Sequence, residues 1–239
     1  MIEKTKAIVI NSIKFGDSSL ITTCYTESSG MKSYIIRGVT SKRAKIRKAH
    51  FLPLMQLELL ARHNNKGKLN SIKELQISKP YQSIHTNISK QTIALFLGEV
   101  LYGAIKEEEG NTDLFQYLET AFLWLDTHDD ISNFHLLFLL KLTQFLGFYP
   151  ELDEKESKYF DLMEGKFSKR NTFYTVSGEK LDLFKKLLGI NFDTVHHTRF
   201  KASERQMILS LIIDYFELHL SGFKKPKSLN ILKTVFSSS

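Results

Sequence analysis

The sequence contains few of the residues that build covalent or metal-bound frameworks, and it has no long hydrophobic run. Its 239 residues include one cysteine, Cys24, and only four prolines. A single cysteine excludes an intrachain disulfide framework and a cysteine-rich zinc site. The most apolar stretch, 134–148, contains Lys141 and Gln144 and falls short of the ~20 residues that a membrane span needs. The first apolar run, 7–10, is too short for a signal-peptide core. We therefore expect a cytoplasmic protein without a membrane partner.

The remaining composition is that of a folded protein with a sizeable core. Apolar residues make up 42% of the chain, aromatic residues 12% and charged residues 25%. These values argue against disorder. The length suits one large domain or two small ones.

Positive charge is concentrated in the first third of the chain. Residues 1–80 contain 15 Lys and Arg against 5 Asp and Glu, whereas the remaining residues contain 18 and 21. The net charges are therefore +10 and −3. Charge that only maintained solubility would not segregate so sharply. The asymmetry predicts that the first third faces a polyanion.

Residues 1–80 have the pattern of a small β domain. Short β-branched and aromatic runs alternate with turn signals such as 27–30 and 64–67. Five strands in a segment of this size predict an OB-fold, a partly open barrel that often binds single-stranded nucleic acid. The predicted strands cover residues 6–13, 20–25, 32–37, 52–60 and 69–77.

Residues 81–239 have mainly helical spacing of apolar residues. Asn87 is a candidate N-cap, and Asn111 begins a second helix. A third helix is expected over 132–146, and further helices follow residue 177. The polar segment 151–177 interrupts them with short hairpin strands. The predicted class is α+β: a five-stranded OB-fold β-barrel, then an α-helical domain with a small β-hairpin insertion.

The segment 41–48 is the strongest candidate for binding. Five of its eight residues are cationic, and no acidic residue occurs between Glu27 and Glu58. Such a run can follow a phosphate backbone, although a solvated loop is the alternative. The candidate DNA-binding cations in this run, on the strand before it and in the last hairpin turn are Lys32, Arg37, Lys42, Arg43, Lys45, Arg47, Lys48, Lys66 and Lys68.

Aromatic side chains are the second requirement for binding single strands, because every base has a face on which a ring can stack. Tyr34 and Tyr25 are the candidates, with Phe15 behind them. Strand alternation places Tyr34 on the same face as Lys32. A place in the barrel core is the alternative for each ring.

Catalytic signals are weak. The sequence has no phosphate-binding loop, no GxSxG and no HExxH motif. The adjacent pair His196 and His197 lacks the further ligands that a metal site needs. We expect no enzyme activity and no metal site.

Several segments, in this order, resemble the RecO family of bacterial recombination mediators. The N-terminal matches are 5–11, 15–27 and 36–39 with the basic run after them, followed by 52–59. The C-terminal matches are the helix exit at 145–150, then 215–220 and 226–232. The similarity covers nearly the whole chain.

The resemblance implies an OB-fold domain, residues 1–80, and a helical domain, residues 81–239. It implies DNA repair and homologous recombination: binding of single- and double-stranded DNA, annealing of complementary strands and, with RecR, loading of RecA onto DNA coated by single-stranded DNA-binding protein. It further implies contact with the C-terminal tail of single-stranded DNA-binding protein and a place at the nucleoid. DNA contacts of the family carry over to Arg37 and residues 42–48.

One departure from the family concerns residues 151–177. Many members have a four-cysteine zinc site there, whereas this segment has neither Cys nor His. We therefore expect no zinc and no other cofactor in this degenerate zinc-finger-like region. The acidic part, 151–164, is a poor DNA surface, and the chain beyond residue 80 is expected to contact proteins. Packing would have to hold the hairpins through Tyr159, Phe160, Phe167, Phe173 and Tyr174.

Two other functions fit the residues. The first is an OB-fold factor that binds RNA or the ribosome. The second is a protein-interaction adaptor, in which apolar pockets between helices within 88–146 accept a short hydrophobic tail.

Overall fold

The structure, a computed structural model, describes residues 2–41, 44–64 and 69–237. Spatial contacts divide the chain into two compact units, 1–127 and 128–239. In its described residues the first unit contains five strands, two α-helices and one short 3₁₀ helix, so the α-helices group with the sheet although the sequence suggested a division at residue 80. The second unit contains the other helices and a small sheet.

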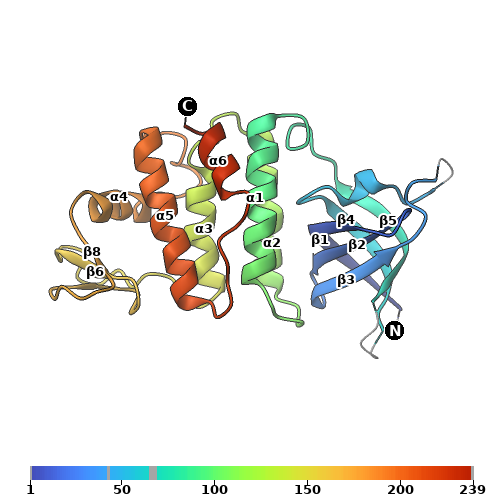
Figure 1. Ribbon diagram of the computed structural model, residues 1–239, viewed down its shortest axis with the longest axis horizontal. Coiled ribbons are helices and arrows are strands. Elements are labelled where there is room, and N and C mark those ends of the chain that lie inside the picture. The colour runs from blue at the N-terminus through green and yellow to red at the C-terminus, as the bar shows by residue number, and fades with distance from the viewer. Residues whose placement is uncertain (1, 42–43, 65–68, 238–239) are drawn as a thin grey trace. The chain divides into compact units, whose positions relative to one another are not determined.

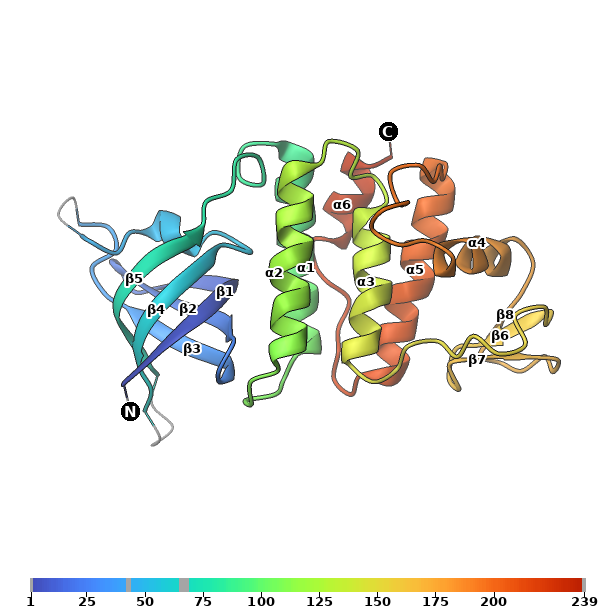
Figure 2. The same ribbon diagram turned by 180° about the vertical axis from the view of Figure 1, so that it is seen from behind.

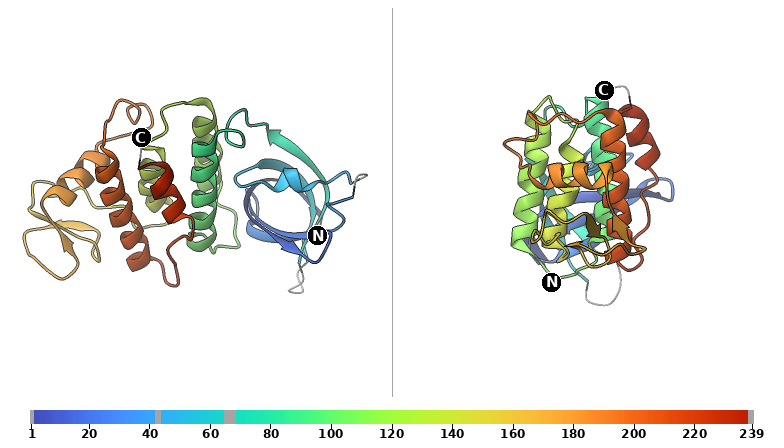
Figure 3. Two further views of the ribbon diagram at one scale, coloured as in Figure 1. Left: turned by 45° about the horizontal axis from the view of Figure 1, so that its top comes forward. Right: turned by 90° about the vertical axis from the view of Figure 1, so that its left-hand side faces the viewer.

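The five strands of the first unit form one antiparallel sheet in the order β3-β2-β1-β4-β5. The sheet curls on itself, as Figure 3 shows. Its two edges meet at one isolated parallel bridge, between Tyr34 and Asn70. The sheet is thus OB-fold-like and open, not the closed barrel that a continuous ladder would make. The strands are β1 (Ile2–Phe15), β2 (Ser19–Thr26), β3 (Gly30–Ile36), β4 (Gln56–Arg62) and β5 (Ser71–Lys79).

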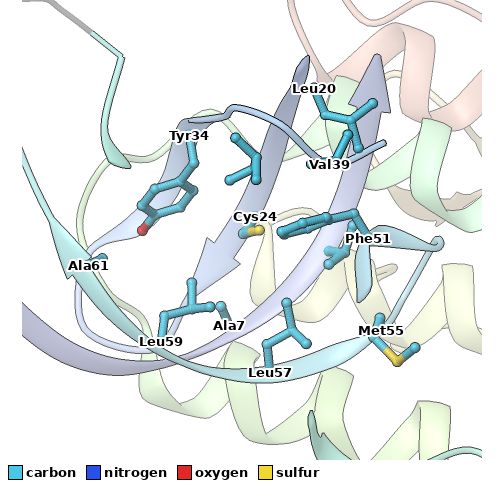
Figure 4. Close-up of a cluster of buried hydrophobic side chains, with 12 residues drawn as sticks. Ala7, Leu20, Cys24, Tyr34, Val39, Phe51, Met55, Leu57, Leu59 and Ala61 are labelled. Atoms are coloured by element: carbon cyan, nitrogen blue, oxygen red, sulfur yellow. The ribbon is translucent and has the colours of Figure 1, made fainter. Parts of the chain in front are cut away.

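The concave side of this sheet encloses an apolar core (Figure 4). Alternation along β4 directs Leu57, Leu59 and Ala61 inward, as the period of a strand requires. Each buried leucine contributes roughly 1.5–3 kcal/mol through the removal of apolar surface from water. The other buried members are Ala7, Val9, Leu20, Cys24, Tyr34, Ile36, Val39, Phe51 and Met55.

Two helices complete the first unit: α1 (Ile88–Ala104) and α2 (Thr112–Thr127), which lie side by side in Figures 1 and 2. The predicted cap is confirmed, since the Asn87 side chain accepts hydrogen bonds from the backbone N–H groups of Ser89 and Lys90. Helix α1 approaches β1 closely at Gly98, where a Cβ would lie 2.8 Å from the Ile10 carbonyl oxygen. Glycine is therefore required at this contact.

A buried ionic cluster fixes the connection from β5 to α1. The Asp126 carboxylate accepts hydrogen bonds from the backbone N–H groups of Gln82, Ser83 and Ile84. Burial acts to raise the pKa of Asp126, but these hydrogen bonds outweigh it and hold that pKa below its ordinary value. The buried Lys90 Nζ donates to Ser83 Oγ at 2.7 Å and to the Asp126 carbonyl oxygen at 2.8 Å. Hydrogen bonds thus compensate the burial of the Asp126 and Lys90 charges.

Over residues 128–237, the second unit contains four helices and a three-stranded sheet of order β7-β6-β8 (Figure 1). Helix α5 packs against α3 and α4. These elements confirm the α+β class and the small hairpin insertion. In the part of the chain that the structure describes, no helix is long and apolar enough to cross a membrane. The elements are α3 (Phe134–Phe145), β6 (Tyr159–Asp161), β7 (Lys166–Ser168), β8 (Thr175–Val176), α4 (Glu179–Leu188), α5 (Ala202–His219) and α6 (Leu229–Val235).

Candidate nucleic-acid interface

The basic loop, residues 37–48, leaves the end of β3 and enters the 3₁₀ helix η1 (Lys48–Phe51). Four of the predicted contact residues are exposed on it. Two others, Lys42 and Arg43, lie outside the described residues. The exposed cations are Arg37, Lys45, Arg47 and Lys48.

Apolar side chains anchor this loop to the sheet. Val39 and Phe51 are buried in the core, and Ile46 packs against it (Figure 4 shows Val39 and Phe51). Because Ile46 turns inward, its neighbours Lys45 and Arg47 remain exposed. Arg37, Lys45, Arg47 and Lys48 are therefore presented to solvent close to positions that pack against the sheet.

Hydrogen bonds hold the loop beside the turn between β1 and β2. The Val39 N–H donates to the Ser18 carbonyl oxygen at 2.9 Å. The Ser12 hydroxyl donates to the Phe51 carbonyl oxygen at 3.1 Å. The first contact places the basic loop, and the second places η1, next to the end of β1. Lys14 and Phe15 are exposed there, and 51% of Phe15 is accessible.

The aromatic predictions need a correction. Tyr34 has no exposed surface, and its hydroxyl shares a hydrogen bond with His63 Nε2 at 2.9 Å. Burial raises the pKa of Tyr34 well above its ordinary value and that of Tyr25 to about 12. Tyr25 is also fully buried and stacks on Phe115 with 6.2 Å between ring centroids. The prediction that Tyr34 stacks on bases is therefore wrong, and of the three rings only Phe15 is exposed.

Lys32 is also placed differently from the sequence-based expectation. Its side chain is largely covered, and its Nζ lies 3.7 Å from Glu108 Oε2 and donates to the Glu108 carbonyl oxygen at 3.2 Å. A phosphate would have to displace both contacts. Lys32 thus attaches β3 to the segment after α1 and does not join the exposed cations. Lys66 and Lys68 lie outside the described residues.

A polar chain that the sequence did not reveal lies beside the bridge that joins the sheet edges. His63 Nδ1 is 3.0 Å from Glu3 Oε2, and His63 Nε2 contacts the Tyr34 hydroxyl. Burial lowers the pKa of His63, while the facing Glu3 carboxylate acts to raise it. The N-terminal strand, β3 and the residue after β4 are joined in this way.

The region 151–177 is held by packing and hydrogen bonds. Phe160 is fully buried, and its ring centroid is 5.1 Å from that of Phe167 and 5.0 Å from that of Phe184. The packing role predicted for Phe160 and Phe167 is therefore confirmed. It is wrong for Phe173, which is 93% exposed, and for Tyr174, which is 40% exposed. Among residues 2–41, 44–64 and 69–237, no group of three or more His, Cys, Asp or Glu could hold a metal ion.

Asp161 is the residue of this region that sequence reasoning missed. Its Oδ1 accepts hydrogen bonds from the N–H groups of Met163 and Glu164 at 3.0 and 3.1 Å, and its Oδ2 accepts one from the Thr172 hydroxyl at 2.9 Å. One carboxylate thereby joins two turns. An Asp before a Glu–Gly turn is the local signal for such an arrangement.

Comparison with known proteins places both halves of the chain in one family. Residues 1–81 match the family model for the N terminus of recombination protein O, and residues 85–229 match that for its C terminus. The DNA repair protein RecO of Flavobacterium johnsoniae is 51% identical over 98% of this chain and 99% of its own length. Those of Bacteroides fragilis and Porphyromonas gingivalis are 38% and 32% identical over 99% of this chain and all of their own length.

Proposed function

The chain belongs to the RecO family of DNA repair proteins, and on that premise we propose that it binds single- and double-stranded DNA, anneals complementary strands and acts as a recombination mediator without catalytic turnover. In this role it works with RecR and with the C-terminal tail of single-stranded DNA-binding protein, and so helps to load RecA at the nucleoid. The basic loop is its principal DNA contact.

The observation that carries this proposal is the outward display of Arg37, Lys45, Arg47 and Lys48 from a loop that Ile46 and Phe51 anchor to the sheet. The backbone that packs at Val39 and Ile46 needs little further ordering when the adjacent cations meet a phosphate backbone. Each phosphate that they neutralise releases counterions, which favours binding at low salt. Two strands held on one cationic surface repel each other less, and this supports annealing.

The test is the salt dependence of oligonucleotide binding. In a variant with Arg37, Lys45, Arg47 and Lys48 changed to Ala, we expect weaker binding and a slope of log affinity against log salt that is shallower by up to about 3, at ~0.7 per phosphate for single strands. Fluorescence anisotropy at several salt concentrations measures both. The matched control changes four exposed lysines of the second unit: Lys155, Lys180, Lys224 and Lys227. An equal slope in the loop variant and the wild type would reject the basic loop as the DNA contact.

The OB-fold-like sheet also fits the alternative of an RNA- or ribosome-associated factor. Binding to DNA and RNA of one sequence separates the two, because the 2′-hydroxyl is the group that differs. Preference for DNA, with annealing activity that falls as salt rises, supports the recombination role. The adaptor role is tested by titrating the protein with an acidic peptide that ends in Phe.

A further inference from the structure

A second group of cations and aromatic rings lies in the second unit, on residues 165–178, which we call the knuckle loop. It contains Lys166, Lys169 and Arg170 and no acidic residue. All three are exposed. Acidic residues flank the loop on both sides, within 151–164 before it and at Glu179 and Asp182 after it. The average charge of the whole region therefore conceals a local excess of +3 on the knuckle loop.

Two aromatic side chains project from the same loop. Phe173 is 93% exposed, the highest value among the large hydrophobic residues of the described chain, and Tyr174 is 40% exposed. Their ring centroids lie 5.2 Å apart, with the ring planes nearly perpendicular. Phe173 thus keeps almost all of its surface available to a ligand.

The backbone that carries these rings is fixed by hydrogen bonds. The Thr172 hydroxyl donates to Asp161 Oδ2, and the Thr172 N–H donates to Thr175 Oγ1 at 3.1 Å. The Thr175 hydroxyl donates to Asn171 Oδ1 at 2.8 Å, and the Leu162 N–H donates to the Tyr174 carbonyl oxygen at 3.0 Å. A loop ordered in advance loses little conformational entropy when a ligand binds. The exposure of Phe173 is therefore a property of a defined conformation.

The cations of the loop remain able to meet a polyanion. Lys166 and Lys169 form ion pairs with Glu164 and Glu154, both at 3.2 Å and both exposed. Exposed pairs of this kind contribute little to stability, so a phosphate can compete for the lysines. Arg170 is exposed and forms no ion pair with any described residue.

We propose that the knuckle loop is a second contact for single-stranded nucleic acid, in which Phe173 and Tyr174 stack on bases while Lys166, Lys169 and Arg170 contact phosphates. This inference rests on the proposed function and extends it to the second unit. Exposed rings between cations are the combination with which sequence-tolerant proteins hold single strands, since stacking accepts any base and the cations follow the backbone. An apolar peptide would make no favourable electrostatic contact with the three cations.

The test uses the full chain with Phe173 and Tyr174 changed to Ala, and a rescue variant with Phe173→Tyr and Tyr174→Phe. Affinity for a single-stranded oligonucleotide should fall at least about fivefold per stacked base in the Ala variant and return in the rescue variant. Affinity for blunt duplex, whose bases are already stacked, should change less than twofold. Both side chains are exposed, so thermal melting should show that the Ala variant remains folded.

A second measurement locates the contact directly. An oligonucleotide with 5-iodouracil is crosslinked to the wild-type protein by ultraviolet light, and the tryptic peptides are mapped. We expect adducts on the peptide 171–180, at Phe173 or Tyr174. Absence of this adduct, together with unchanged single-strand affinity of the Ala variant, overturns the proposal.

The same measurements distinguish this inference from the proposed function. The first outcome is that the Ala changes in the basic loop weaken binding while the Ala changes at Phe173 and Tyr174 do not. This outcome leaves the proposed function in place and refutes the inference. The reverse result supports the inference and refutes the basic loop as the principal contact. When both sets of changes are combined, binding should be weaker than in either variant alone.

Discussion

The basic loop and the knuckle loop both expose cations, but different forces hold them. Val39, Ile46 and Phe51 fasten the basic loop to the core of the sheet, whereas the Asp161 carboxylate and the hydroxyls of its neighbours fasten the knuckle loop. The described residues of the basic loop expose four cations, Arg37, Lys45, Arg47 and Lys48, and no aromatic ring. The knuckle loop also packs Phe167 inward, but its hydrogen-bonded part exposes Phe173 and Tyr174. The two loops therefore offer different chemistry: cations without rings in one, and cations with aromatic rings in the other.

The largest expected effect tests the packing beneath each loop. Phe51→Ala in the first unit and Phe160→Ala in the second should each lower the free energy of unfolding by about 3–5 kcal/mol, because each removes a buried ring. Urea denaturation followed by circular dichroism measures this loss. Phe173→Ala is the matched control and should change stability by less than about 0.5 kcal/mol. An equal loss in Phe173→Ala and Phe160→Ala would show that Phe173 is buried in solution.

A fall in pH should destabilise the second unit through the buried imidazole of His135. Burial, assisted by the nearby charge of Arg205, lowers the pKa of His135 in α3 to about 3, from 6.5 for an exposed imidazole. Below pH ~6.5 the imidazole is protonated in the unfolded chain but stays neutral in the folded chain. The free energy of unfolding therefore decreases as the pH falls. From pH 7.5 to 5 the loss should be about 2 kcal/mol, at 1.36 kcal/mol per unit below 6.5.

Denaturation of wild type and His135→Leu at both pH values measures this effect. The substitution removes the titrating group, so the variant should lose less stability than the wild type over this interval. If both lose the same amount, His135 is not the source of the pH dependence.

A smaller effect concerns the hydrogen bonds of the knuckle loop. Asp161→Asn keeps the shape of the side chain but removes its charge and replaces one of its two acceptor oxygens with a donor, at a cost of about 1–2 kcal/mol. Hydrogen exchange at Met163 and Glu164 should accelerate about 5- to 30-fold if opening of the loop remains local. Asp153→Asn, at an exposed position, is the control and should leave these rates unchanged. Unchanged protection in Asp161→Asn would mean that Asp161 does not organise the loop.

Much of the fold could be predicted because its local signals agree with its tertiary packing. The helical spacing and the Asn87 cap anticipated α1, and five β-branched runs anticipated the five strands. The degree of closure could not be predicted, because it depends on the single bridge between Tyr34 and Asn70, which are far apart in sequence.

The site was harder to predict than the fold. Alternation placed Tyr34 and Lys32 on one face of β3, but the sequence alone does not tell which face a curled sheet encloses. Both faces of this strand carry polar and apolar residues, and the face with Tyr34 is the one that points into the core. The exposure of Phe173 depends on hydrogen bonds that Thr172 donates to Asp161 and Thr175, and no periodicity encodes them.

The region 151–177 is held by Phe160 and Asp161 and not by thiolates, which affects its sensitivity to oxidation. A zinc site built on thiolates loses its metal when an oxidant attacks the sulfur. Residues 151–177 contain no sulfur ligand of this type, and the one thiol of the chain, Cys24, is buried with its pKa raised to about 12 by desolvation. A protonated, buried thiol reacts slowly with peroxide. Neither the one cysteine nor the packing of the hairpins therefore depends on a reactive thiolate.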